Sequence, residues 1–198
     1  MPFIFKRLVL SLSIAAAFAA DKDSAPFRPA AAESYEHHQT NAKVTIGVDS
    51  YTTPEKQKAA FGKLDLYSRG ILPVLVVIQN GGDKAIELDR IKVEYVGPNR
   101  NRVDATPAKE VRYLNGPRRP DVIAGPTGPV PGRIKKNPLD AWEVEGRAFA
   151  AKTLPPGESA SGFFYFQAGL QSGSTIYISR ITEAASGQEL FYFEIPLQ

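Results

Sequence analysis

Hydrophobic residues in this chain mostly follow the two-residue period of β-strands. Val44, Ile46 and Val48 alternate with small or polar residues, which predicts a half-buried strand. Residues 71–78 are apolar throughout and predict a strand covered by an opposing sheet on one face and by a loop or helix on the other. Aromatic residues fill positions 163–166. They predict a second core strand with rings on both faces.

The other strand signals are shorter. Apolar positions 86 and 88 are followed by 91, 93 and 95, and this change of phase predicts a bulge or a break near residues 89–90. A weaker strand is expected over 103–106. Segments 176–181 and 190–195 predict a hairpin joined through Ser186 and Gly187.

One short helix is predicted over residues 54–61. Thr52 and Glu55 have the spacing of a capping box, Pro54 suits the first turn, and Gly62 is placed to end the helix. Residues 114–139 are rich in proline and glycine, so no strand or helix is expected there. Together these segments predict an all-β protein: an antiparallel β-sandwich of about seven to eight strands, with one short helix and a long Pro/Gly-rich loop. A β-barrel is the alternative.

The first 19 residues have the pattern of a secretory signal peptide. Lys6 and Arg7 precede an apolar stretch, and Ala17 and Ala19 supply the small residues of a cleavage site after Ala19. The apolar stretch is shorter than the roughly 20 residues that a transmembrane helix needs; an uncleaved anchor is the alternative. We therefore expect a periplasmic or extracellular protein without a transmembrane segment. We expect a signal peptide at 1–19, a flexible tether at 20–42, and a β-sandwich domain at 43–198 with an irregular loop at 114–139.

Composition changes this picture in two ways. The chain has no cysteine, which excludes disulfides, a lipid-modified N-terminal cysteine and a cysteine nucleophile. The net charge of +3 includes Lys6 and Arg7, so the mature chain is almost neutral. Its charge is unevenly distributed, because residues 97–136 hold nine basic and three acidic side chains. This asymmetry predicts a local positive field.

Two segments resemble a known group of domains. Residues 76–88 form an apolar strand, an Asn-Gly-Gly-Asp-Lys turn and a return strand, and residues 154–166 form a Leu-Pro-Pro-Gly-Glu turn followed by an aromatic strand. Both are similar to segments of bacterial extracytoplasmic immunoglobulin-like domains. The resemblance implies an immunoglobulin-like β-sandwich. The group includes adhesion modules, envelope scaffolds and inhibitors, so the resemblance transfers no site.

Residues that could support catalysis or metal binding favour structural interpretations. A Ser-His-Asp triad would need His37 or His38, and both lie in the expected tether, as does the cluster that they form with Glu33 and Glu36. We expect this cluster to be a solvated linker.

The acidic pairs 143/145 and 87/89 have the spacing of one strand face and favour a solvated edge over a pair of catalytic carboxylates. Asn80 and Asp83 suit a tight turn better than a calcium site. The sequence predicts no catalytic residue, no metal site and no cofactor.

The remaining candidate is the basic loop. Its cations could meet an anionic surface, with flanking aromatic side chains as stacking or anchoring groups. Nucleic acid is disfavoured by the expected compartment, which leaves an envelope protein, an anionic glycan or a lipid surface as partner. The alternative is that the loop carries charge only to stay solvated. The predicted site residues are Arg118, Arg119, Arg133, Lys135, Lys136, Tyr113 and Trp142.

These observations predict an exported, non-enzymatic interaction or accessory module of the cell envelope. Two alternatives are a carboxylate-dependent hydrolase with a loop-lined cleft and an assembly or chaperone factor. The hydrolase requires acidic or histidine side chains that converge in a pocket. The assembly factor requires an uncovered strand edge that can pair with a partner strand.

Overall fold

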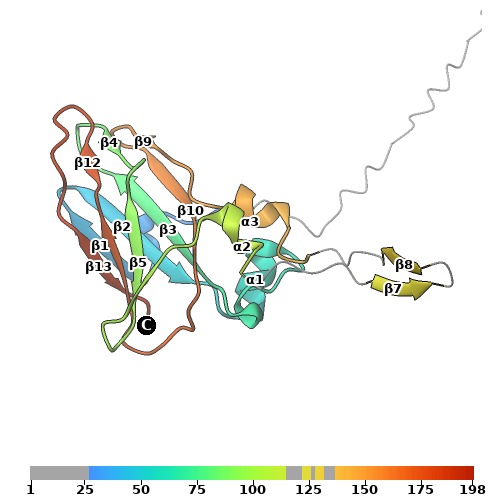
Figure 1. Cartoon of the computed structure of the whole chain (residues 1–198). Helices are drawn as coiled ribbons and strands as arrows, with labels where there is room; N and C mark the ends of the chain where they lie inside the picture. The colour runs from blue at the N-terminus through green and yellow to red at the C-terminus, as the bar shows by residue number, and fades with distance from the viewer. Residues whose placement is uncertain (1–26, 115–121, 126–127, 132–136) are drawn as a thin grey trace, which may run out of the picture.

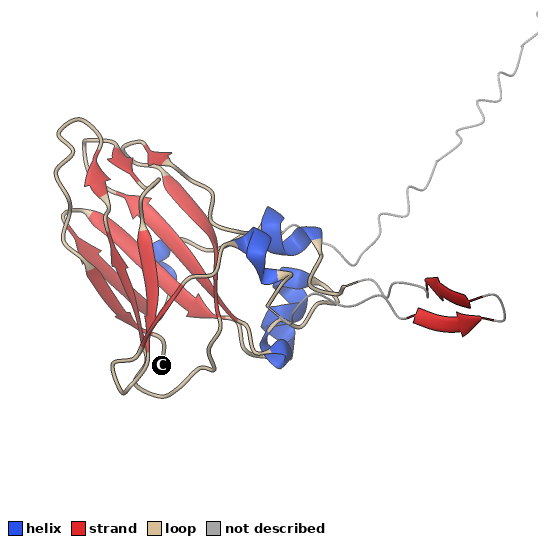
Figure 2. Ribbon diagram, viewed as in Figure 1, coloured by secondary structure: helices blue, strands red, loops and turns tan. Residues whose placement is uncertain are grey.

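The computed structural model of the chain describes residues 27–114, 122–125, 128–131 and 137–198. The described chain consists mostly of antiparallel β-sheets with few, short helices (Figures 1 and 2). None of the helices in these ranges is long and apolar enough to cross a membrane.

Two four-stranded sheets make up most of the fold. The first sheet has the order β1-β2-β3-β10 and contains β1 (His37–Asn41), β2 (Val44–Ser50), β3 (Leu72–Asn80) and β10 (Ser159–Phe166). The second sheet has the order β13-β11-β5-β6 and contains β13 (Phe193–Pro196), β11 (Thr175–Ser179), β5 (Lys92–Val96) and β6 (Arg102–Asp104).

Two smaller sheets complete the β-structure. A three-stranded sheet has the order β12-β4-β9 and contains β12 (Thr182–Glu183), β4 (Ile86–Glu87) and β9 (Thr153–Leu154). The fourth is a hairpin of β7 (Val122–Gly125) and β8 (Gly128–Pro131).

The central strand β3 is buried on both faces. Val74 and Val76 point into the core between the two large sheets, which they share with Ile178 of β11. Leu75 and Val77 point the other way, into a second core. The predicted two-sided burial of residues 71–78 is confirmed. It follows from strand geometry, because successive side chains project to opposite faces.

The second core is covered by helices. Buried side chains of α1 (Pro54–Phe61), α2 (Ala108–Val111) and α3 (Trp142–Gly146) pack with Phe163 and Tyr165 of β10. Figures 1 and 2 show the three helices gathered at one end of the sheets. We call this part of the molecule, α1 to α3 together with the faces of β3 and β10 that they cover, the helical end.

Helix α1 has the predicted bounds, Pro54–Phe61. The cap differs by one residue: the Thr53 hydroxyl, rather than that of Thr52, accepts a hydrogen bond from the Lys56 amide at 3.4 Å. Gly62 follows the helix with φ +64°, a conformation that glycine adopts without steric cost.

The change of hydrophobic phase near residues 89–90 corresponds to a break between sheets. β4 pairs with β9 and β12, whereas β5 pairs with β11 and β6. The predicted C-terminal hairpin is present as the antiparallel pair of β11 and β13, and β12 in the connection joins the three-stranded sheet.

The segment expected to be a tether departs from the prediction. Residues 37–41 form β1, paired in register with β2, and the short 3₁₀-helix η1 (Ala32–Ser34) packs beside them with Ala32 fully buried. The ordered domain therefore begins before residue 43. Periodicity did not reveal β1 because it is an edge strand of polar residues, held by backbone hydrogen bonds rather than by an apolar face.

Two further expectations need correction. The loop expected at 114–139 contains the β7–β8 hairpin, which proline allows because each strand of a two-stranded ribbon keeps one unpaired edge. Residues 142–146 form α3 instead of a strand. Two glutamates, Glu143 and Glu145, lie in its first turn, where negative charge favours a helix.

Candidate functional site

The helical end brings together the described chain on either side of residues 115–136, the stretch that we call the basic segment. The Asn137 side-chain amide donates a hydrogen bond to the Arg112 carbonyl oxygen at 2.7 Å, across the base of residues 115–136. The Arg112 guanidinium pairs with Asp140 at 2.8 Å and with Glu145 of α3. This arrangement, which we call the neck, fixes where the basic segment leaves and rejoins the domain.

Two of the predicted site residues lie at the neck and are exposed. Tyr113, just after α2, has 64 % of its surface accessible, and Trp142, at the start of α3, has 71 %. Each ring leaves apolar area exposed that a partner could bury. The five predicted cations, Arg118, Arg119, Arg133, Lys135 and Lys136, lie outside the described residues.

Part of the basic excess in residues 97–136 is neutralised inside the fold. Arg112 pairs with two carboxylates at the neck. Arg102, on β6, pairs with Glu94 at 3.0 Å and lies over the Tyr177 ring, at 4.6 Å from its centre. Charge counting along the sequence therefore overestimated the cations free to meet a partner.

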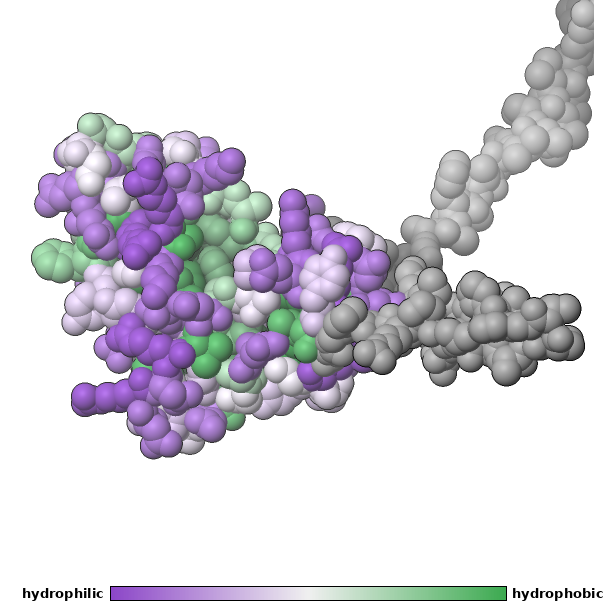
Figure 3. All heavy atoms as spheres, in the orientation of Figure 1, coloured by the Kyte–Doolittle hydropathy of each residue, from purple (hydrophilic) through white to green (hydrophobic). Residues whose placement is uncertain are grey.

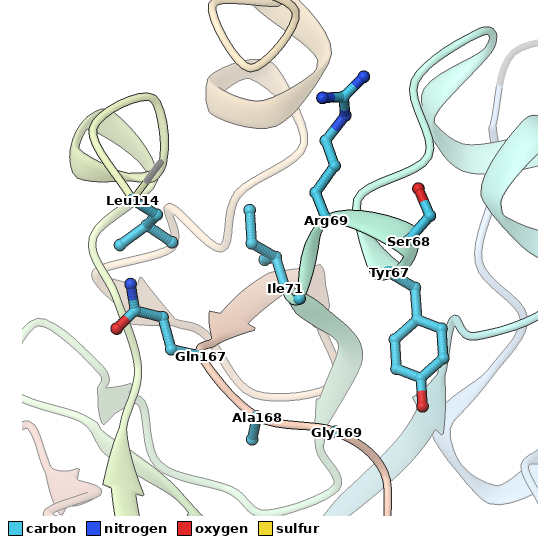
Figure 4. Close-up of a pocket in the computed structure, with 9 residues that line it drawn as sticks. Tyr67, Ser68, Arg69, Ile71, Leu114, Gln167, Ala168 and Gly169 are labelled. Atoms are coloured by element: carbon cyan, nitrogen blue, oxygen red, sulfur yellow. The ribbon is translucent and has the colours of Figure 1, made fainter. Parts of the chain in front are cut away.

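A broad, open cavity of about 710 Å³ borders the neck. Leu114 and Ile71 lie across it from each other, while Arg69 and Tyr67 project from the 3₁₀-helix η2 (Tyr67–Arg69) in different directions (Figure 4). Its other described walls come from the segment after β10. No carboxylate or imidazole is among its described lining residues, so nothing described there forms a general acid–base pair.

A second cavity, of about 360 Å³, lies between α3 and residues 161–162 at the outer edge of β10. Trp142 and Arg147 border it on one side, Phe27 on another, and Ser161 of β10 on a third. The Arg147 guanidinium carbon is 4.9 Å from the centre of the Phe27 ring. The described lining therefore includes two aromatic rings and a single cation.

Buried tyrosines beside this cavity are held neutral. Burial raises the pKa of Tyr51 and of Tyr165 far above the ordinary value, and the nearby Arg147 charge opposes that rise only in part. The Tyr165 hydroxyl donates a hydrogen bond to the Val144 carbonyl of α3 at 2.7 Å. These contacts fix α3, and with it Trp142, against β10.

The edges of the first sheet are largely occupied. On β10, Thr106 bridges to Tyr165 and Ala148 bridges to Phe163. At the other edge, the Gln39 side chain of β1 accepts a hydrogen bond from the Glu194 amide of β13 at 2.9 Å. A partner strand would therefore meet covered edges over most of this sheet.

The other candidates from the sequence have structural roles in the fold. His38 lies on β1, where its Nδ1 contacts the Tyr35 carbonyl at 2.7 Å. Asn80 closes the predicted turn: its Oδ1 accepts from the Gly82 amide at 3.0 Å, and its Nδ2 donates to the Leu154 carbonyl at 3.0 Å. Within the described ranges, no group of three or more His, Cys, Asp or Glu side chains has the geometry to hold a metal ion.

Sequence reasoning missed Arg147. Its neighbour Phe27 lies in the expected tether, and Ser161 lies between the predicted turn at 154–158 and the aromatic strand at 163–166, so no local motif joined the three residues. Arg147 carried no signal of its own, because its surroundings combine residues 142–162 with Phe27, which lies more than 100 residues away in sequence.

Comparisons with known proteins add little. No protein-family model matches the chain, and no curated protein shows significant similarity to it. A solved structure, described as a functionally unknown protein from Listeria monocytogenes EGD-e, is similar over 81 % of each chain, with 12 % sequence identity and a TM-score of 0.35.

Proposed function

We propose that this protein is an exported, non-enzymatic module of the cell envelope that binds an anionic partner through its helical end. The observation that carries the proposal is the exposure of Tyr113 and Trp142 on the two sides of the neck, next to a segment rich in basic residues. Exposed aromatic side chains beside cations are typical of interaction surfaces.

An immunoglobulin-like identity for the sandwich is part of the proposal. It is supported by the way the two motif segments meet: the Asn80 amide donates to the Glu158 carbonyl at 2.9 Å, and the Gly157 amide donates to the Asn80 carbonyl at 2.7 Å. The turn after the first motif and the turn that opens the second are thus one hydrogen-bonded unit.

Export is the second part. Cleavage after Ala19 would leave Phe27, the first described residue, in the mature chain with seven residues before it. Mass spectrometry of protein from the exported fraction should give an N-terminus at Ala20. An intact form that begins at Met1 and fractionates with membranes would contradict export with cleavage.

The binding test removes five charges from the basic segment. In this variant Arg118, Arg119, Arg133, Lys135 and Lys136 are replaced by glutamine. Retention on three anionic probes is measured: poly-glutamate, a sulfated polysaccharide, and vesicles that contain phosphatidylglycerol. We expect the parent protein to bind one of these probes and the variant to lose that binding, with little change in melting temperature because exposed charges contribute little to folding.

A matched control removes the same charge elsewhere. Five exposed cations in the sheet loops are without an ion pair in the described part of the chain, and they are replaced together by glutamine: Lys43, Arg90, Arg100, Lys152 and Arg180. This control should retain binding. Binding by the parent should weaken with salt, because the Debye length falls from about 10 Å at 0.1 M to about 3 Å at 1 M. Equal loss in both variants would mean that net charge, rather than the helical end, decides binding.

A further inference from the structure

Arg147 has a buried nitrogen without a partner. Its Nη1 is inaccessible to solvent and donates no hydrogen bond to any described residue. Its guanidinium also takes part in none of the ion pairs found within the described ranges. A partly buried cation without a compensating group is costly, and a charged side chain of this kind in a cleft marks a candidate ligand site.

The cavity beside Arg147 suits an anion that also carries an apolar group. Phe27 and Trp142 line it, and no acidic side chain is among the described residues of its wall. The Phe27 ring lies over the guanidinium and keeps water from one of its faces. Exclusion of water strengthens the attraction between this cation and an incoming negative charge.

The outer edge of β10 adds a backbone donor at its N-terminal part. Phe163 uses its amide and carbonyl on this edge, in hydrogen bonds to the Arg147 carbonyl at 2.8 Å and from the Phe149 amide at 3.2 Å. Backbone groups alternate along an antiparallel strand, so the Ser161 amide, two residues earlier, faces the same edge. No described backbone group accepts a hydrogen bond from it there, and Ser161 lines the cavity.

We propose that this cavity binds a carboxylate attached to an aromatic or other apolar group. Arg147 would pair with the carboxylate, the Ser161 amide would donate to it, and the apolar group would rest on Phe27 and Trp142. A carboxylate fits better than a phosphate, because a single planar guanidinium matches its shape and charge and no second cation lines the described wall. The inference rests on the proposed function in that it specifies one contact of an anionic partner at the helical end.

The chain carries its own reporter for the test. Trp142 is the sole tryptophan, and it borders the cavity, so its fluorescence should respond to a bound ligand. Phenylacetate titrated into the mature protein should give a saturable change. Phenylacetamide, which has the same shape without the charge, should give none at the same concentrations. If the two compounds behave alike, the cavity does not recognise a carboxylate and the proposal is overturned.

Substitutions assign the effect to Arg147. Arg147→Met keeps the length of the side chain without its charge, and we expect at least a tenfold loss of phenylacetate affinity. Arg147→Lys keeps the charge without the planar guanidinium, and its affinity for phenylacetate should lie between those of Arg147→Met and the parent. The control Arg69→Met, in the other cavity, should bind as the parent does. If Arg147→Met fails to fold, the comparison of phenylacetate with phenylacetamide on the parent still decides the question.

Further measurements distinguish the possible sources of the carboxylate. To test a chain terminus, binding of a blocked dipeptide with a C-terminal phenylalanine is compared with binding of its amide. To test an acidic side chain, the same dipeptide is compared with a blocked amide in which glutamate precedes phenylalanine. Asp21 and Asp23 precede Phe27 in the sequence, so the variant Asp21→Asn, Asp23→Asn tests the chain itself. Phenylacetate binding that tightens tenfold in this variant would mean that the chain's own carboxylate occupies the cavity and would overturn recognition of a partner.

Failure here is distinguishable from failure of the proposed function. If phenylacetate does not bind but the charge-neutralised variant still loses its anionic probe, the helical end binds a partner without this cavity. If phenylacetate binds and no anionic probe does, the cavity acts without the basic segment.

Discussion

The two faces of β3 differ in how they are packed. The face toward the second sheet is lined by aliphatic and aromatic side chains from strands, and Figure 3 shows polar residues covering much of the outer surface of those strands. The face toward the helices also contains buried polar contacts. Gln57 of α1 is almost fully buried, and its side chain accepts a hydrogen bond from the Leu66 amide at 3.1 Å and donates to the Tyr51 carbonyl.

This contrast separates two tasks. Along most of β3 the core between the sheets is held by apolar burial, which needs no particular partner for any one side chain, and the buried polar side chain on this face, Asn80, lies at the end of the strand. The helical end is held by specific polar contacts between distant segments, and it presents both cavities next to the neck. We infer that the first face supplies stability and the second positions the groups that meet a partner.

The largest effect should come from the core between the sheets. Phe166 is fully buried there, so Phe166→Ala should cost about 3–5 kcal/mol of unfolding free energy. Phe164 is only partly buried and stacks on Phe149 at 5.4 Å between ring centres, so Phe164→Ala should cost clearly less. Chemical denaturation of the two variants measures the difference. Equal costs would mean that the core is misplaced.

Gly162→Ala should be next in size. A Cβ at this position would lie 2.3 Å from the Phe149 Cα, which is backbone and cannot turn aside. The strain should cost roughly 1–3 kcal/mol and displace the segment after α3 from β10. Gly169→Ala is the control, because a Cβ there meets no atom within 4 Å. If both variants unfold at the same denaturant concentration, residues 148–149 do not cover this edge.

Loss of one tyrosine hydroxyl should lower the free energy of unfolding by a smaller amount, and the two variants compare the helical end with the core between the sheets. Tyr165→Phe removes the donor to the Val144 carbonyl and leaves a buried acceptor unpaired, at a cost of about 1–2 kcal/mol. Tyr95→Phe removes a part-buried hydrogen bond to the Gly169 carbonyl at 3.0 Å and should cost about 0.5–1 kcal/mol. Thermal melts of the two variants rank them. The reverse order would show that the helical end does not depend on its polar contacts.

Two buried phenols should change the free energy of unfolding at alkaline pH and not at neutral pH. Burial raises the pKa of Tyr51 and Tyr165 above the ordinary value of about 10, so both phenols stay neutral in the folded protein where the unfolded chain ionises. The stability that they contribute is therefore full below that ordinary value and is lost as the pH rises through and beyond it. Absorbance at alkaline pH should show these two phenols ionising only with unfolding. Early, reversible ionisation of all eight tyrosines would contradict their burial.

Local sequence signals predicted the parts of the fold that depend on period and capping. The two-sided burial of 71–78, the bounds of α1 and the break near residues 89–90 each come from a pattern within ten residues. The polar edge strand β1 and the short helix α3 lacked such a pattern. β1 is held by backbone pairing with the neighbouring strand β2, and α3 is held by a contact with Tyr165 of β10, which lies about 20 residues away in sequence.

Only part of the candidate site could be predicted from the sequence, because the rest of it depends on residues that are far apart in the chain. Tyr113 and Trp142 flank a basic segment in the sequence, and the structure places both at the neck. Arg147 and its cavity depend on Phe27 and β10, which meet α3 only in the folded chain. Folding also pairs Arg112 with carboxylates, a neutralisation that charge counting cannot show.

The most direct test of the division between the two faces uses the four exposed large hydrophobic residues of the described chain. Tyr113 and Trp142 lie at the helical end, and Phe191 and Tyr192 lie just before β13. Each pair is replaced by serine in a separate variant, and affinity for the anionic probe that the parent binds is measured by calorimetry. We predict at least a tenfold loss for the pair at the helical end and no change for the pair before β13, with both variants melting near the parent temperature. Equal affinity in the two variants, or a loss confined to the pair before β13, would contradict the account.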